Sequence, residues 1–285
     1  MSDPAARDGR RDGIDSRRRM AWRYALALGL IAVPLLFAVL GPLFAGAPES
    51  RAVSFTTGRG HWLGTDFAGR DVWRQVLLGG RSVVVVAVAA TVLAYLVAIP
   101  LGLAAALTGR SWLAELLIRP LDVLLAVPSL LFVLLVAALF RPGPGELVPV
   151  VALVTVPDAA RVVFSAATEI ASRPVVEALR MQGESWWRIA VGYVARSMRR
   201  TLAADLGTRL TGALYLVATA AFLGVGVAPD ASDWAVMVDR NRVGLFLQPW
   251  AVVVPAALIV ALSMGTNLLF DAALQGPRER TGEHR

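Results

Sequence analysis

The chain contains no cysteine and no lysine, and it has only two histidines among its 285 residues. Without cysteine it can form neither a disulfide nor a thiolate metal site. Without lysine it cannot contain a phosphate-binding loop of the GxxxxGK[ST] type, so the chain is not itself a P-loop ATPase. His61 and His284 lie far apart, in a loop and in the C-terminal tail, so the sequence offers no histidine cluster for a metal ion.

Charged residues are nearly absent from several long stretches, and 56% of the chain is hydrophobic, with a mean hydropathy of +0.62. This composition is typical of membrane proteins. A spanning helix needs about 20 mainly apolar residues, and runs of that length satisfy their backbone hydrogen bonds in lipid as helices. The sequence therefore predicts an all-α polytopic membrane protein with six transmembrane helices. The predicted spans are Tyr24–Ala45, Ser82–Gly109, Val123–Phe140, Glu146–Thr168, Leu210–Pro229 and Val243–Phe270.

All 28 basic residues are arginines, and their distribution predicts the orientation. Seven lie in residues 1–23, two in 108–119, seven in 161–200 and three in 278–285, against eight in the three loops on the opposite side. This is the positive-inside bias, which predicts that both termini are cytoplasmic. Topology thus explains the net charge of +7 without nucleic acid as a partner.

The first apolar run has a competing interpretation as a cleaved signal peptide, because Ala45-Gly46-Ala47 resembles a cleavage site. The run has 22 uncharged residues, which is longer than a typical signal-peptide core and favours a retained membrane anchor.

The predicted organisation has four parts. They are a disordered cytoplasmic tail at 1–19, the first transmembrane helix with an external amphipathic segment at 20–80, a five-helix core at 81–275 with a cytoplasmic loop at 170–199, and a cytoplasmic tail at 276–285. Within the external segment, Gly64–Gly80 carries Val72, Trp73, Val76 and Leu77 on one face, which predicts a short helix lying on the membrane surface.

Charged residues recur at helical spacing near the ends of the spans. Residues three or four apart share a helix face, so each pair can neutralise itself locally. The predicted pairs are Arg119 with Asp122, Asp158 with Arg161, and Asp205 with Arg209. Ionisable groups within a membrane are candidates for function. Because all three pairs map near cytoplasmic helix ends, we expect them to support the inner loops, with a place on the transport path as the alternative.

The segment Pro174–Val194 is an amphipathic interruption between apolar runs. Pro174 suits the first turn of a helix, and Gly183 permits a left-handed turn that would end it. A second apolar stripe follows at helical spacing: Trp186, Ile189, Ala190, Tyr193 and Val194. Two short helices at an angle would form a knob that fits a groove on a partner. The alternative is an ordinary loop that folds back on its own bundle.

In this segment, Glu177-Ala178 followed by Gly183 resembles the EAA loop of permease subunits of binding-protein-dependent ABC importers. More closely, the chain resembles the C-type permease of dipeptide, oligopeptide and nickel importers over about residues 20–275. The blocks that carry the resemblance are Leu63–Val83, Ile118–Leu130, Glu177–Ile189, Leu223–Trp234 and Pro249–Asp271.

The resemblance implies a type I ABC importer permease fold, in which Pro174–Val194 is a coupling loop that docks into a cleft of the ATPase subunit. The implied coupling residues are Glu177, Ala178, Gly183, Trp187, Arg188 and Ile189. Leu179 replaces the second alanine of the motif, and Val194-Ala195-Arg196 lacks the proline that ends it in the family. The chain itself would bind no cofactor, since ATP and Mg would be held by partner subunits.

The implied function is a non-enzymatic transmembrane subunit of an ATP-driven importer in the plasma or inner membrane. Its implied partners are a second homologous permease, two ATP-binding subunits, membrane lipid, and an external binding protein that meets residues 46–80 and 227–249. Di- or oligopeptides are the expected cargo. Nickel is an alternative, although the scarcity of histidine and absence of cysteine give it no support. An ion-coupled secondary transporter would show repeats and midplane charges, and a membrane enzyme would need a catalytic constellation that the sequence lacks.

Overall fold

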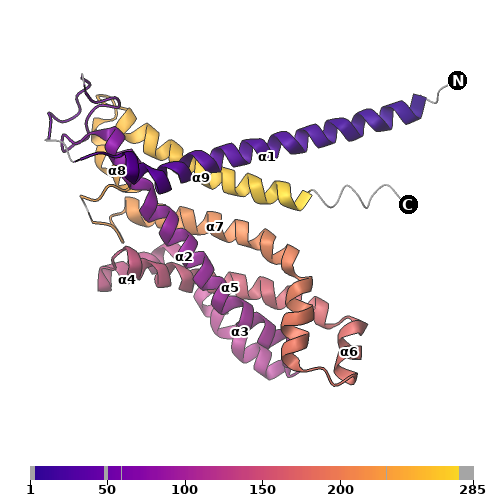
Figure 1. The fold of residues 1–285 in the computed structure, drawn as a ribbon. Coiled ribbons are helices and arrows are strands. Elements are labelled where there is room, and N and C mark those ends of the chain that lie inside the picture. Colours follow the sequence, from indigo (N-terminus) through magenta and orange to yellow (C-terminus); the bar gives the residue numbers. More distant parts are fainter. Residues whose placement is uncertain (1–3, 48–50, 59, 229, 276–285) are drawn as a thin grey trace.

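The computed structural model describes residues 4–47, 51–58, 60–228 and 230–275 (Figure 1). This part of the chain is nearly all helical and contains no β-strand, only isolated bridges between Gly58 and His61 and between Thr65 and Asp71. The predicted all-α class is therefore confirmed. The predicted tail at 276–285 lies outside the described residues.

The elements follow one another with short connections, except for the long segment before α2. They are α1 (Pro4–Phe44), α2 (Val72–Leu107), α3 (Ser111–Leu125), α4 (Ser129–Phe140), α5 (Pro144–Ala171), α6 (Pro174–Met181), the π-helix η1 (Arg188–Ala195), α7 (Arg199–Phe222), α8 (Trp234–Asn241), the 3-10 turn η2 (Arg242–Gly244) and α9 (Trp250–Gln275).

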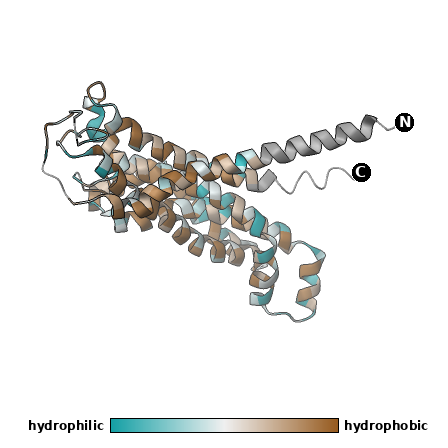
Figure 2. Cartoon of the chain, turned by 45° about the horizontal axis from the view of Figure 1, so that its top comes forward, coloured by the Kyte–Doolittle hydropathy of each residue, from teal (hydrophilic) through white to brown (hydrophobic). Residues whose placement is uncertain are grey.

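Four of the described helices are individually long and apolar enough to cross a membrane. These stretches are Ala21–Phe44, Val72–Leu107, Pro144–Ala171 and Trp250–Ala272, and the bent pair α3 and α4 makes a fifth if it counts as one span. Figure 2 shows these helices as predominantly apolar, with hydrophilic residues gathered toward their ends. α7 has 24 residues, but it carries Asp205 and Arg209 and is not apolar enough to count among these spanning helices. The prediction of several spanning helices is confirmed, and the count of six is supported only in part.

The prediction of one continuous helix over Val123–Phe140 is wrong. α3 ends at Leu125, α4 begins at Ser129, and the two helices meet at 81°. Pro128 explains the break, because it has no N–H to donate and it disfavours helical geometry at Val127. The last predicted span also begins later than expected: α9 starts at Trp250, directly after Pro249.

The separate surface helix predicted within Gly64–Gly80 is also wrong. α2 begins at Val72, capped by Asp71, and continues for 36 residues. Val72 and Val76 are fully buried and pack against Trp234, so this face meets protein rather than the membrane surface. Its amphipathic pattern came from contact with α8, which lies far away in the sequence.

α1 begins at Pro4, within the N-terminal tail that was predicted to be disordered. Extending an existing helix adds hydrogen bonds without a new nucleation step, which lowers the cost of helix formation beyond the apolar run.

α2 and α5 form the most extensive helix pair in the bundle, and α1 packs along α9 (Figure 1). Small residues allow the close approach. A Cβ atom placed on Gly102 of α2 would lie 2.5 Å from Cγ1 of Val163 on α5. A stripe of fully buried alanines continues this face along α2: Ala87, Ala90, Ala94 and Ala98. Small residues at such interfaces are typical of membrane helix packing.

The bundle has two distinct ends (Figure 1). The helix α6, the N-terminal end of α1 and the C-terminal end of α9 lie toward one of them, which we call the α6 end. α8 and the loops around it lie at the other, which we call the α8 end.

Candidate functional site

The predicted coupling segment forms a projecting knob, defined here as residues 174–194. Its first helix, α6, begins with Pro174 in the first turn, as predicted. Gly183 then has φ +77°, and Glu184 donates its N–H to the carbonyl of Leu179 at 3.1 Å, which closes the helix end. A Cβ atom on Gly183 would meet nothing within 4 Å. The requirement for glycine is therefore conformational, and the predicted left-handed turn is confirmed.

The second half of the knob is helical from Trp186 and adopts π geometry over Arg188–Ala195. Most of the predicted stripe points inward: Ile189, Ala190 and Val194 are buried, Tyr193 is half-buried, and only Trp186 is exposed. The buried residues pack against apolar side chains of α2 and α5, namely Leu103, Leu107, Val163, Ala167 and Ile170. The knob is thus anchored on its own bundle by one face.

The opposite face of the knob exposes large apolar side chains. Met181 is 80% exposed and Trp187 is 71% exposed, and Val175 and Val191 are exposed beside them. Charged residues surround this face, including an ion pair between Arg188 and Glu184 at 3.1 Å. A rigid surface of apolar anchors within a charged rim can dock into a groove on another protein.

The predicted coupling residues do not all have the same environment. Glu177, Gly183, Trp187 and Arg188 are exposed, and Ala178 is half-buried. Ile189 differs, because it is only 4% exposed and belongs to the apolar cluster beneath the knob. Its side chain can hold the knob in place but cannot reach a partner.

The unusual end of the motif, Val194-Ala195-Arg196, is helical, and the helix is interrupted just after it. Arg196 has helical backbone angles, whereas Met198, the N-cap of α7, has φ −89° and ψ 3°. Hydrogen bonds span the interruption, because the N–H of Met198 donates to the carbonyl of Val194 at 3.1 Å and that of Leu202 donates to the carbonyl of Met198 at 2.9 Å. The absence of proline thus leaves these N–H groups free to connect the knob to α7.

The charged residues near the spans pair differently from the local prediction. Arg119 contacts Glu115 at 2.8 Å instead of Asp122. Asp122 on α3 contacts Arg161 on α5 at 2.6 Å. The first two predicted pairs are therefore wrong, because Asp122 and Asp158 pair with arginines of neighbouring helices, which leaves Arg119 to pair with Glu115 on its own helix.

Arg209 contacts two of these acidic residues, one on its own helix and one on α5. It contacts Asp205 at 3.1 Å, as predicted, and also Asp158 on α5 at 3.1 Å. Asp205 in turn accepts a hydrogen bond from the hydroxyl of Tyr95 on α2 at 2.6 Å. The resulting network ties α2, α5 and α7 together. Tyr95 was missed from the sequence, where its only signal was a polar hydroxyl within an apolar run.

The network borders a pocket of about 280 Å³ between α4, α5 and α7, which we call the inner pocket. Its polar lining includes Ser129, Thr155, Asp158 and Arg209. Polar groups around a cavity inside a helix bundle are the arrangement expected where solute or water passes.

The Gly64–Asp71 block lies at the α8 end and holds its loops together. Asp66 is 1% exposed and accepts hydrogen bonds from the backbone N–H of Ala68 and of Arg70, both at 2.8 Å, and from Gln75 Nε2 at 3.0 Å. Arg70 contacts Asp66 at 2.8 Å and donates to the carbonyl of Asp230 at 2.7 Å. The block therefore joins the α1–α2 connection to the α7–α8 loop.

A second contact at this end centres on Trp234, which is fully buried and donates its indole N–H to the carbonyl of Val76 at 2.8 Å. Beside it Asp233 caps α8 and accepts a hydrogen bond from Ser82. Burial raises the pKa of Asp233, against the opposing effect of these hydrogen bonds. Among the described residues, no three histidine, cysteine or acidic side chains come together as a metal site.

Comparison with known proteins matches residues 98–278 to the family described as the binding-protein-dependent transport system inner membrane component. A peptide permease protein of Brucella abortus is 29% identical over 264 residues, which cover 90% of this chain and 87% of that protein. The D,D-dipeptide transport system permease protein of Escherichia coli is 26% identical, covering 85% and 82%. The glutathione transport system permease protein of Pectobacterium atrosepticum is 26% identical, covering 74% and 70%.

Among solved structures, the inward-facing MetNI methionine ABC transporter is similar in fold, with a TM-score of 0.56 and 13% identity over 68% of this chain and 92% of that chain. The family match spans more than half of the chain, and relatives align along most of its length. The chain therefore belongs to the family of binding-protein-dependent transport system inner membrane components, as the membrane-embedded permease subunit of an ABC importer.

Proposed function

We propose that this permease subunit moves di- or oligopeptides inward, driven by ATP hydrolysis on separate subunits. The named activities of its relatives support this cargo, because peptide, dipeptide and glutathione permeases align over most of the chain. A tripeptide and a dipeptide share a backbone with charged termini, so one path suits the whole class.

The observation that carries the proposed mechanism is the exposed apolar face of the knob at the α6 end. We assign this end to the cytoplasm, in line with the arginine distribution. There the knob would dock into one of two ATP-binding subunits, with Trp187 and Met181 as its apolar anchors. ATP and Mg would remain on those subunits.

The other partners follow from the same orientation. The loops at the α8 end, 46–80 and 227–249, would meet an external binding protein that delivers the cargo. A second, homologous permease would complete the path beside the inner pocket.

A pair of glycine variants tests the coupling role. Gly183→Val should uncouple transport, because a β-branched residue resists φ +77° and disrupts the end of α6. Gly109→Val is the matched control: Gly109 has φ +66°, also in open space, but lies in the α2–α3 turn, outside residues 174–194. The measurements are recovery of the assembled complex, ATPase activity stimulated by binding protein and peptide, and peptide uptake into liposomes.

We expect Gly183→Val to assemble but to lose stimulated ATPase activity and uptake, and Gly109→Val to retain both. Equal activity of the two variants would show that the knob does not couple. Uptake by the wild-type complex without ATP would contradict the importer mechanism in favour of an ion gradient.

A further inference from the structure

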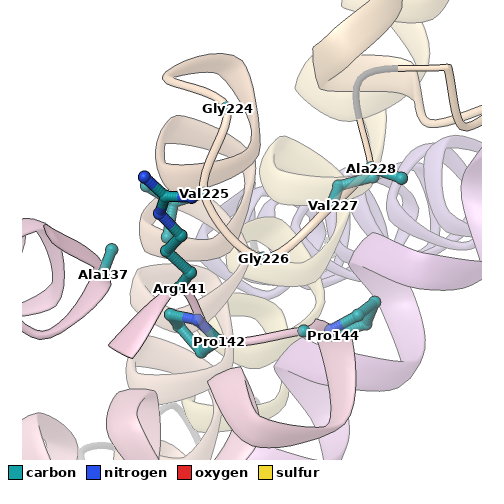
Figure 3. Close-up of a pocket in the computed structure, with 10 residues that line it drawn as sticks. Ala137, Arg141, Pro142, Pro144, Gly224, Val225, Gly226, Val227 and Ala228 are labelled. Carbon is teal, nitrogen blue, oxygen red and sulfur yellow. The ribbon is translucent and has the colours of Figure 1, made fainter. Parts of the chain in front are cut away.

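A second pocket, of about 470 Å³, lies at the α8 end, and we call it the outer pocket (Figure 3). Its walls come from the C-terminal end of α4, the turn into α5 and the loop that follows α7. Arg141 rises along one wall beside Val225, opposite the bend at Gly226 (Figure 3). Its volume is within the usual range for small-molecule sites, about 300–1,000 Å³.

Arg141 is the only charged residue in the lining, and its side chain makes no hydrogen bond or ion pair with any residue that the structure describes. The nearest carboxylate in the sequence, Glu146, is already used, since it accepts the backbone N–H of Gly143 at 3.0 Å. A positive charge therefore borders the pocket without a local counter-charge in contact with it.

The backbone at Arg141 is also unusual. Its φ is +46°, a left-handed conformation at the end of α4 that normally favours glycine. A bulky residue held in this conformation is an outlier of the kind that gathers at binding sites. In the loop after α7, Gly224 and Gly226 are also left-handed, and a Cβ atom on Gly224 would meet nothing within 4 Å, so the backbone is open there between Val225 and the end of α7.

The outer and inner pockets are in register along the same three elements. On α4, Ala137 lines the outer pocket and Leu130 the inner one, seven residues or two turns apart. On α5, Pro144 lines the outer pocket and Thr155 the inner one, about three turns apart. Two turns span about 11 Å. The face shared by α4, α5 and α7 thus carries an isolated cation at its outer end and the Asp158–Arg209 pair further in.

We propose that the outer pocket is an entry subsite in which Arg141 binds the C-terminal carboxylate of an incoming peptide. This rests on the proposed peptide function. An arginine guanidinium matches a carboxylate with two parallel hydrogen bonds. The open space beside Gly224 leaves room for the peptide backbone, and the carboxylate would supply the counter-charge that Arg141 lacks.

The test uses the complete transporter in phosphatidylcholine liposomes, with its binding protein and a defined mixture of unmodified tri- to pentapeptides measured by mass spectrometry. Arg141→Gln should raise the apparent KM for uptake about tenfold, the size expected for loss of a charge-assisted hydrogen bond. Arg141→Lys should recover most of the loss, and Arg141→Glu should be worse than Arg141→Gln. Arg81→Gln is the control. Arg81 is an exposed arginine in the N-terminal third of α2, and it has no ion-pair partner among the described residues.

Wild-type KM in Arg141→Gln and Arg141→Glu would overturn the subsite while leaving the peptide function intact. Loss of assembly or of stimulated ATPase activity in Arg141→Gln, with KM unchanged, would assign Arg141 a structural role instead. A defect that appears only when anionic phosphatidylglycerol is added would assign it to a lipid headgroup. If the wild-type complex imports none of the peptides, the proposed cargo fails and the subsite fails with it.

Discussion

At the scale of single residues, the α8 end depends on Asp66 more than on any exposed charge near it. Its buried carboxylate accepts hydrogen bonds from two backbone N–H groups and from the side chains of Arg70 and Gln75. Loss of this carboxylate would leave several buried donors without acceptors, which is more costly than loss of an exposed ion pair.

We expect Asp66→Ala to lower the free energy of unfolding by about 3 kcal/mol, because each unsatisfied buried donor costs about 1–3 kcal/mol. Asp239→Ala removes a partly exposed contact to Arg242 at 2.9 Å, and it should cost less than about 1 kcal/mol. Thermal unfolding of the purified subunit complex in detergent would measure both. Similar losses in the two variants would show that Asp66 is not the centre of this end.

Sequence reasoning at this scale succeeded where the constraint was local. The left-handed glycine at Gly183 followed from its position after an apolar turn, and the structure shows φ +77° there. It failed for Asp122 and Arg161, because their distance in space depends on how α3 and α5 pack. The isolated charge of Arg141 could not be recognised at all, since a sequence does not show which side chains lack a partner.

At the scale of helices, the close contact of α2 and α5 depends on a position with no side chain. Gly102 allows the two backbones to approach, and the neighbouring residues Val163 and Phe164 leave no room for a Cβ atom. The contact therefore requires a residue without a side chain at position 102, and a hydrophobic residue of any size would not meet this requirement.

We expect Gly102→Ala to reduce stability by about 2 kcal/mol, within the range for overpacked cores. Gly29→Ala is the matched control, because Gly29 also lies in a spanning helix but a Cβ atom added there would meet nothing within 4 Å. Its substitution should be neutral or favourable, since alanine stabilises helices relative to glycine. The fraction of monodisperse protein after heating would distinguish the two, and parallel behaviour would argue against the α2–α5 contact.

The helices themselves were predictable wherever apolar length determined them. The exceptions were places where one residue overrode the pattern. Pro128 divided an apolar run into two helices at 81°. The face around Val72 looked amphipathic because it packs on Trp234, more than 150 positions later in the chain. Contacts over such separations leave no local periodicity to detect.

At the scale of the whole molecule, the contact between Arg209 and Asp158 links the middle of α7 to the middle of α5. Asp158 is about half exposed, where it lines the inner pocket. A double-mutant cycle of Asp158→Asn and Arg209→Gln should give a coupling energy of about 1 kcal/mol. The pair Glu169 and Arg173, 3.5 Å apart and exposed at the turn between α5 and α6, should give less than about 0.5 kcal/mol. Equal values would mean that the interhelical pair adds nothing to the packing of α7.

The bend between the knob and α7 has a mechanical consequence. Met198 interrupts the helix there, but the hydrogen bonds from Met198 to Val194 and from Leu202 to Met198 span the interruption. α7 has 24 residues and is therefore about 36 Å long. A tilt of α7 by about 10° about this point would displace its far end by about 6 Å. That end runs directly into Gly224 and Gly226, which line the outer pocket together with Arg141. A movement of the knob would thus reach the outer pocket through a single helix.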